Sequence, residues 1–240
     1  LGWQHILFMD DDIRGITVDD LICTVSLLKR GFRSAGMQVK YFPDNSVVCH
    51  ARRMVGLDQG VFVSGSLLAV DCTAPFGFFP DIYNEDWLFF YRAVATRNLA
   101  SPGRHATQMR QMKYNPFADP QRAAREEFGD TIAEGLYSLL HHGDSCLKFP
   151  ESQYWEQFLH DRNAILEDVF QQLHKAPVEL RDEIKKAILI ARDTLQKITP
   201  VMCVDYIAAW QRDLEMWEDS LANLPRGLAI EKALHELDLN

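Results

Sequence analysis

The sequence predicts an α/β fold over residues 1–115, followed by an all-helical region over residues 116–240. Short apolar segments alternate with helical patterns before Pro116, whereas apolar residues recur at helical spacing almost throughout the rest of the chain. Hydrophobic residues make up 47% of the 240 residues, enough for a substantial core. We therefore expect a mixed sheet with flanking helices, and a helical region that packs against it or follows it.

Composition narrows the class of protein. The formal net charge of −9 argues against a nucleic-acid partner and against a polybasic membrane-binding patch. No stretch approaches the ~20 consecutive apolar residues of a membrane span, so we expect no transmembrane segment. The five cysteines are scattered and form no C-x-x-C pair, which favours reduced thiols and a cytoplasmic location.

The first predicted strand ends in three acidic residues. Residues 6–9 are all apolar, which predicts a buried strand, and Asp10, Asp11 and Asp12 follow directly. Side chains alternate along a strand, so Asp10 and Asp12 are expected to point the same way. Three adjacent anions repel one another, and Mg²⁺ or Mn²⁺ would compensate them because both prefer oxygen ligands. The pattern predicts a D-x-D metal site at a strand end.

The next segments continue the alternation of helix and strand. A helix is expected over residues 18–32, a strand over 38–42 and a short helix over 46–55. A further strand over 61–70 is interrupted by Ser64-Gly65-Ser66, where the backbone is expected to approach a ligand. The apolar face of the first helix is expected to consist of Val18, Leu21, Ile22, Val25, Leu28 and Phe32.

A second acidic segment begins a helix predicted over residues 84–97. Asn84 is a favourable N-cap, which places Glu85 and Asp86 in the first turn. Acids there can simply complement the helix dipole. Aromatic residues crowd around the pair, however, and a partly desolvated carboxylate can act as a general base. The residues alone leave both interpretations open.

Together, these segments resemble the catalytic half of a GT-A glycosyltransferase, particularly the inverting family-2-like enzymes. The resemblance rests on the strand and D-x-D of residues 8–12, Ser64-Gly65-Ser66, Gly77-Phe78-Phe79, and Glu85-Asp86 with Trp87-Leu88. It covers roughly residues 1–115. It implies that residues 1–115 are the C-terminal catalytic half of a GT-A-like domain.

The resemblance also implies roles in binding. Asp12 would bind the metal directly, and Asp10 would contact the metal or the ribose of the donor. His105 is the candidate for a further metal ligand by its position. Ser64 and Gly65 would contribute to donor binding. The implied cofactor is Mn²⁺ or Mg²⁺, and the implied partners are a nucleotide-sugar donor and a hydroxyl acceptor.

The reaction that the resemblance implies is transfer of a sugar with inversion. Asp86 would be the base that removes the proton of the acceptor hydroxyl, with Glu85 supporting it. The N-terminal half that binds the nucleotide in such enzymes is expected to be missing, because Leu1 lies almost directly before the D-x-D strand.

Two other classes stay open. A haloacid-dehalogenase-like phosphohydrolase also carries an apolar strand ending in D-x-D, but its motif continues with Thr or Val where this chain has Arg14. It also uses a later Lys and an Asp pair, which Asn84-Glu85-Asp86 fits poorly. The second is a non-catalytic interaction protein built on a degenerate transferase fold.

The helical region is expected to supply packing and no chemistry, because its apolar residues recur at helical spacing. The two expected core stripes are Phe128, Ile132, Leu136 and Leu139/Leu140, and Leu180, Ile184, Ile188, Ala191 and Leu195.

Overall fold

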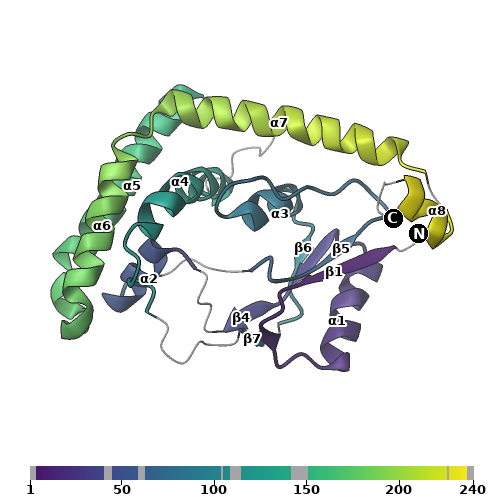
Figure 1. Cartoon of the computed structure of the whole chain (residues 1–240), viewed down its shortest axis with the longest axis horizontal. Helices are drawn as coiled ribbons and strands as arrows, with labels where there is room; N and C mark the ends of the chain where they lie inside the picture. Colours follow the sequence, from purple (N-terminus) through teal and green to yellow (C-terminus); the bar gives the residue numbers. More distant parts are fainter. Residues whose placement is uncertain are drawn as a thin grey trace.

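The computed structural model confirms a mixed α/β protein (Figure 1). Within the described residues every strand lies before residue 109, and the chain beyond residue 120 forms helices and no strand. The structure describes residues 4–40, 45–58, 63–103, 105–108, 115–141, 151–225 and 227–236.

The larger sheet is built around β5 (Leu67–Asp71), whose residues are all buried. Its order is β1 (His5–Met9), β5, β3 (Ser34–Gly36) and β6 (Leu99–Ala100). β1 and β3 both run antiparallel to β5, and β6 runs parallel to β3. This topology brings the end of β1 beside the segment that leads into β5, because Met9 pairs with Leu67.

A smaller sheet lies next to the acidic turn that follows β1. Its order is β2 (Ile13–Arg14), β7 (His105–Gln108) and β4 (Gln38–Lys40), with β7 antiparallel to β2 and parallel to β4. Ile13 packs in a small buried cluster with Met37 and Leu67. The turn is therefore anchored at both ends by sheet residues.

The expectation that β1 is fully buried is wrong. Leu7 and Met9 are 39% and 54% exposed. Among the described strands, β1 pairs with β5 alone, so it lies at the edge of the sheet. An apolar run indicates which residues favour burial, but burial also requires neighbours on both sides of the strand.

The first helix, α1 (Val18–Lys29), is shorter than the predicted range and faces the sheet differently. Val18 and Ile22, which were expected on the buried face, are 71% and 57% exposed. The buried residues are Asp20, Thr24 and Leu28. The Thr24 hydroxyl donates to the Asp20 carbonyl at 2.8 Å, so this polar side is satisfied when it packs against the sheet.

The remaining helices agree with the predicted pattern. The helices expected over 46–55 and 84–97 are α2 (Val47–Met54) and α3 (Glu85–Ala95). None of the helices in the described residues is long and apolar enough to cross a lipid bilayer. The helical region consists of α4 (Arg122–His141), α5 (Ser152–Gln171), η1 (Leu173–Lys175), η2 (Val178–Leu180), α6 (Arg181–Leu195), α7 (Pro200–Asn223) and α8 (Ile230–Glu236).

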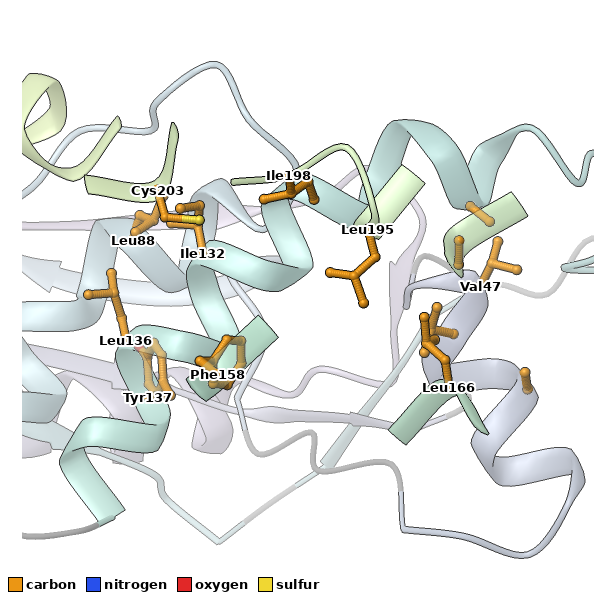
Figure 2. Packing of buried hydrophobic residues seen from close by; sticks show 14 of the residues in the cluster. Val47, Leu88, Ile132, Leu136, Tyr137, Phe158, Leu166, Leu195, Ile198 and Cys203 are labelled. Carbon is orange, nitrogen blue, oxygen red and sulfur yellow. The ribbon is translucent and has the colours of Figure 1, made fainter. Parts of the chain in front are cut away.

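The sheet region and the helical region share one hydrophobic core. One buried cluster includes Val70 of β5, Leu88 of α3 and Ile132 of α4. Figure 2 shows members of this cluster from several helices, among them Leu136 of α4 and Cys203 of α7. The predicted stripes therefore form core, and α3 lies between the sheet and α4 (Figure 1).

Candidate functional site

A cavity of about 490 Å³ brings the two acidic segments together. Its walls come from the end of β1, the turn before β5 and the segment that begins α3. Five of the predicted site residues line it, namely Asp10, Ser64, Gly65, Glu85 and Asp86. The sequence separates these residues by up to 76 positions. The antiparallel pairing of β1 with β5 brings Asp10 beside the Ser64-Gly65-Ser66 turn, and a hydrogen bond from Gly65 to Asp86 joins that turn to α3.

The acidic turn begins with Asp10. The Asp10 backbone N–H donates to the Ser66 carbonyl at 3.0 Å, and the Ile13 N–H donates to the Asp10 carbonyl at 3.2 Å. Asp10 and Asp11 are exposed, whereas Asp12 is only partly exposed. The Asp12 Oδ1 atom is buried and has no hydrogen-bond partner among the described residues. A buried carboxylate oxygen in this position can accept a hydrogen bond or bind a cation.

The predicted metal ligands are not assembled into one site in the part of the chain that the structure describes. No three His, Cys, Asp or Glu side chains gather there in a manner that would hold a metal ion. The side chain of His105 lies outside the described residues, although its backbone belongs to β7. Asp12 is not among the residues that line the cavity. The oxygen donors of Asp10 and Asp12 do suit a hard divalent cation, and the orphaned Asp12 oxygen fits one.

The Ser64-Gly65-Ser66 turn is closed by its own side chains. The Ser64 and Ser66 hydroxyls are 2.7 Å apart, and the Ser66 N–H donates to the Ser64 hydroxyl at 3.1 Å. A Cβ atom at Gly65 would lie 2.4 Å from the Cβ of Asp86, which is closer than two non-bonded carbon atoms approach in proteins. The close approach expected at this glycine is therefore made by Asp86 itself. Donor binding by Ser64 and Gly65 stays a prediction.

Asp86 is fixed in the cavity wall by two backbone donors. Its Oδ2 accepts a hydrogen bond from the Gly65 N–H at 2.7 Å, and its Oδ1 accepts one from the Trp87 N–H at 2.8 Å. Burial raises the pKa of Asp86 to about 6, although these hydrogen bonds act in the opposite direction. The neighbouring charge of Glu85 adds to the rise. A carboxylate with this pKa is mostly ionised at pH 7 and is a competent proton acceptor.

Aromatic rings form another part of the cavity wall. Phe79 is 39% exposed and stacks on Phe89, with ring centroids 4.3 Å apart and an interplanar angle of 12°. Phe8 meets both rings edge to face, at 5.2 and 5.6 Å. The arrangement offers the cavity a rigid apolar surface beside the carboxylates.

Asn84 does not act as the predicted N-cap. α3 begins after it, but its side chain makes no capping hydrogen bond. Its backbone is left-handed, with φ 65° and ψ 34°, a conformation that Asn adopts more readily than most residues. The Asn84 Nδ2 atom instead donates to Asp130 Oδ1 of α4 at 2.8 Å.

Asp130 belongs to a buried ionic cluster that sequence reasoning missed. Arg162 of α5 is fully buried and donates to Glu127 at 2.6 and 3.0 Å, to Asp130 at 3.0 Å and to Glu134 at 2.7 Å. Burial raises the pKa of Glu127 to about 7, while the carboxylates raise the pKa of Arg162 well above its ordinary value. The sequence feature that could have revealed this cluster is the presence of acidic residues at core positions of a helix, next to apolar residues.

A neighbouring pair ties α4 to α2. The Glu126 Oε2 atom accepts a hydrogen bond from the Val47 N–H at 2.8 Å, at the first turn of α2, and Arg122 forms an ion pair with the same carboxylate. Burial raises the pKa of Glu126 to about 7. The acidic side of α4 thus contacts the starts of both α2 and α3.

Comparisons of the chain with protein-family models, with curated proteins and with solved structures found no match, so the candidate site rests on its own geometry.

Proposed function

We propose that this protein transfers a sugar from a nucleotide-sugar donor to a hydroxyl group of an acceptor, with inversion at the anomeric carbon. One observation carries the proposal: Asp86, a carboxylate with a raised pKa and a fixed orientation, lines the same cavity as Asp10 of the D-x-D segment. A base and a donor-binding carboxylate in one cavity are what a single displacement between two substrates requires.

Asp86 is the base in this proposal. Its carboxylate takes the proton of the acceptor hydroxyl while that oxygen bonds to the anomeric carbon. The bond from this carbon to the diphosphate oxygen breaks, and the electron pair leaves with the nucleoside diphosphate. Two backbone N–H groups hold the carboxylate, so little reorganisation precedes proton transfer. One displacement from the opposite face inverts the anomeric configuration.

Asp10 and Asp12 are the residues that would hold a divalent cation. A bound Mn²⁺ or Mg²⁺ would neutralise negative charge on the diphosphate leaving group. The buried Asp12 Oδ1 without a partner supports this assignment, since an oxygen of this type is a preferred ligand of both ions. The Phe79 ring would pack against an apolar face of a sugar.

The test is Asp86→Asn in the full-length protein. Nucleoside diphosphate release is measured with UDP-glucose, UDP-galactose, UDP-N-acetylglucosamine and GDP-mannose, in the presence of Mn²⁺ or Mg²⁺. We expect kcat to fall by about 10²–10⁴-fold while donor affinity is retained, because the amide keeps the shape but cannot take the proton.

Asp81→Asn is the matched control, because Asp81 is exposed, belongs to the same segment and does not line the cavity. It should leave kcat unchanged. An unchanged kcat in Asp86→Asn would contradict the role of Asp86. Release of inorganic phosphate from phosphate monoesters, without diphosphate release from any nucleotide sugar, would favour a phosphohydrolase instead.

A further inference from the structure

The residues on either side of Asp86 are held by α4, a helix of the region that was expected to carry no chemistry. On one side, the Asn84 amide donates to Asp130 at 2.8 Å. On the other, the Tyr137 hydroxyl donates to the Trp87 carbonyl at 2.9 Å. The first turn of α3 is therefore clamped between two side chains of α4.

The approach of α4 to this turn is unusually close. A Cβ atom at Gly129 would lie 2.2 Å from the carbonyl oxygen of Tyr83, so only glycine permits the contact. Gly129 and Asp130 are adjacent, and they meet Tyr83 and Asn84, which are also adjacent. Backbone contact and hydrogen bond thus fix the same two residues immediately before α3.

Asp130 is itself held in place by the buried guanidinium group of Arg162. Its Oδ2 atom accepts from Arg162 Nη2 at 3.0 Å, while its Oδ1 atom accepts from Asn84. Arg162 is fully buried and is fixed by Glu127 and Glu134 as well. A rigid connection therefore runs from α5 through α4 to the residue two positions before Asp86.

We infer that Asn84 is a positioning residue for Asp86, and that the Arg162–Asp130 pair of the helical region aims the Asp86 carboxylate into the cavity by holding Asn84. The catalytic consequence rests on the proposed function of Asp86. Asparagine suits this position because it accepts the left-handed backbone and also supplies the amide donor. Glycine supplies only the first property, and aspartate would place a second carboxylate against Asp130.

The first experiment reads the position of Asp86 without any assay of activity. Asn84→Gly and Asn84→Asp are prepared with ¹³C-labelled aspartate, and the Asp86 carboxyl signal, assigned with Asp86→Asn, is titrated by NMR. In Asn84→Gly we expect the pKa of Asp86 to fall from about 6 toward its ordinary value of 3.8, because a released turn exposes the carboxylate to water. Amide exchange at residues 85–88 should accelerate ~10-fold or more.

The control is Asn115→Gly, which removes a similar bond at another place. The Asn115 amide donates to Glu183 of α6 at 2.6 Å, away from α3. This variant should leave the Asp86 titration and the exchange at residues 85–88 as in the unmodified protein. If Asn84→Gly is too unstable to study, Asn84→Asp carries the test through amide exchange at residues 85–88, since it keeps the size and backbone preference of the side chain. Its titration is not compared, because the added carboxylate itself raises the pKa of Asp86.

The second experiment separates positioning from general stability. With a nucleotide sugar that the protein uses, Asn84→Gly should lower kcat ~10-fold or more and change the donor KM by less than ~2-fold. An unchanged Asp86 titration in folded Asn84→Gly, unchanged amide exchange at residues 85–88 in either Asn84 variant, or an altered titration in Asn84→Gly with an unchanged kcat would overturn the inference. If the unmodified protein uses no nucleotide sugar, the proposed function fails, and the titration alone still decides whether Asn84 positions Asp86.

Discussion

Two groups of carboxylates in this molecule have opposite surroundings. Glu127, Asp130 and Glu134 of α4 surround Arg162, whose side chain is fully buried. By contrast, no lysine or arginine among the described residues forms an ion pair with Asp86, which lines the cavity, or with Asp12 of the turn after β1. The chain supplies a counter-charge where carboxylates build the core. Asp86 in the cavity wall has no such counter-charge from the described residues, and under the proposed function it takes its proton from the acceptor.

The largest expected effect comes from removing the counter-charge of the first group. Arg162→Met would leave three carboxylates in the core around an apolar side chain. We expect a loss of ~3–5 kcal/mol in the free energy of unfolding, measured by urea denaturation at pH 7. Arg125→Met is the control, because its pair with Asp119 is solvent-exposed and should contribute little. Equal stability of the two variants would contradict the contrast between the groups.

The next largest effect concerns how kcat/KM depends on pH through the ionisation of Asp86. Asp86 has a pKa raised to about 6, and a base acts only when it is ionised. We expect kcat/KM to rise with pH up to about 6 and then level off, with a tenfold loss for each pH unit below. Initial rates between pH 4.5 and 8 measure this profile. Asp86→Asn should abolish this loss of kcat/KM at low pH. If the loss persists in the variant, it belongs to the titration of another group.

The raised pKa of Asp86 also affects the stability of the protein, in the direction opposite to its effect on the rate. Because folding raises the pKa of Asp86, the folded protein holds this proton more tightly than the unfolded chain does. The stabilisation of the folded protein by this proton is therefore fully present below pH 3.8, and it is lost as the pH rises through about 6. Rates and stability should thus change in opposite directions across this range.

The smallest effect tests the oxygen of Asp12 that has no partner. We expect millimolar Mn²⁺ to stabilise the unmodified protein by ~1–3 kcal/mol, as a ligand that binds the folded state does. Asp12→Asn should lose this stabilisation, whereas Asp11→Asn should keep it, because Asp11 is exposed. Thermal unfolding with Mn²⁺ and with EDTA measures the difference. An equal Mn²⁺ effect in all three proteins would contradict the D-x-D assignment.

The sequence indicated which residues lie close together better than it indicated the burial of its elements, while the roles of those residues stay predictions. The resemblance to a glycosyltransferase implies that Asp10 and Asp86 serve one site, and in the structure both line one cavity. Periodicity failed at α1, because it identifies apolar residues but not the neighbours that cover them. Val18 is apolar and exposed, while Asp20 is charged and buried.

The hydrogen bonds that hold the segment around Asp86 could not be predicted from the sequence, for a different reason. Asn84 matched an N-cap, a local pattern, yet its partner Asp130 lies 46 positions away on another helix. The bond between Arg162 and Asp130 spans 32 positions. Local patterns report what a residue does to its own backbone. They carry no information on which distant side chain the fold brings beside it.

The contact of Gly65 with Asp86 has a consequence for how such a protein can change over generations. Because no Cβ fits at position 65 while Asp86 is in place, the two positions are constrained as a pair although 21 residues separate them. A descendant that exchanges the Asp86 carboxylate for another side chain still needs glycine at position 65, because the closest contact is with the Cβ atom of Asp86. One that first gains a side chain at position 65 displaces residue 86. The glycine therefore outlasts the carboxylate, and a side chain at position 65 identifies a lineage in which the start of α3 has moved away from this turn.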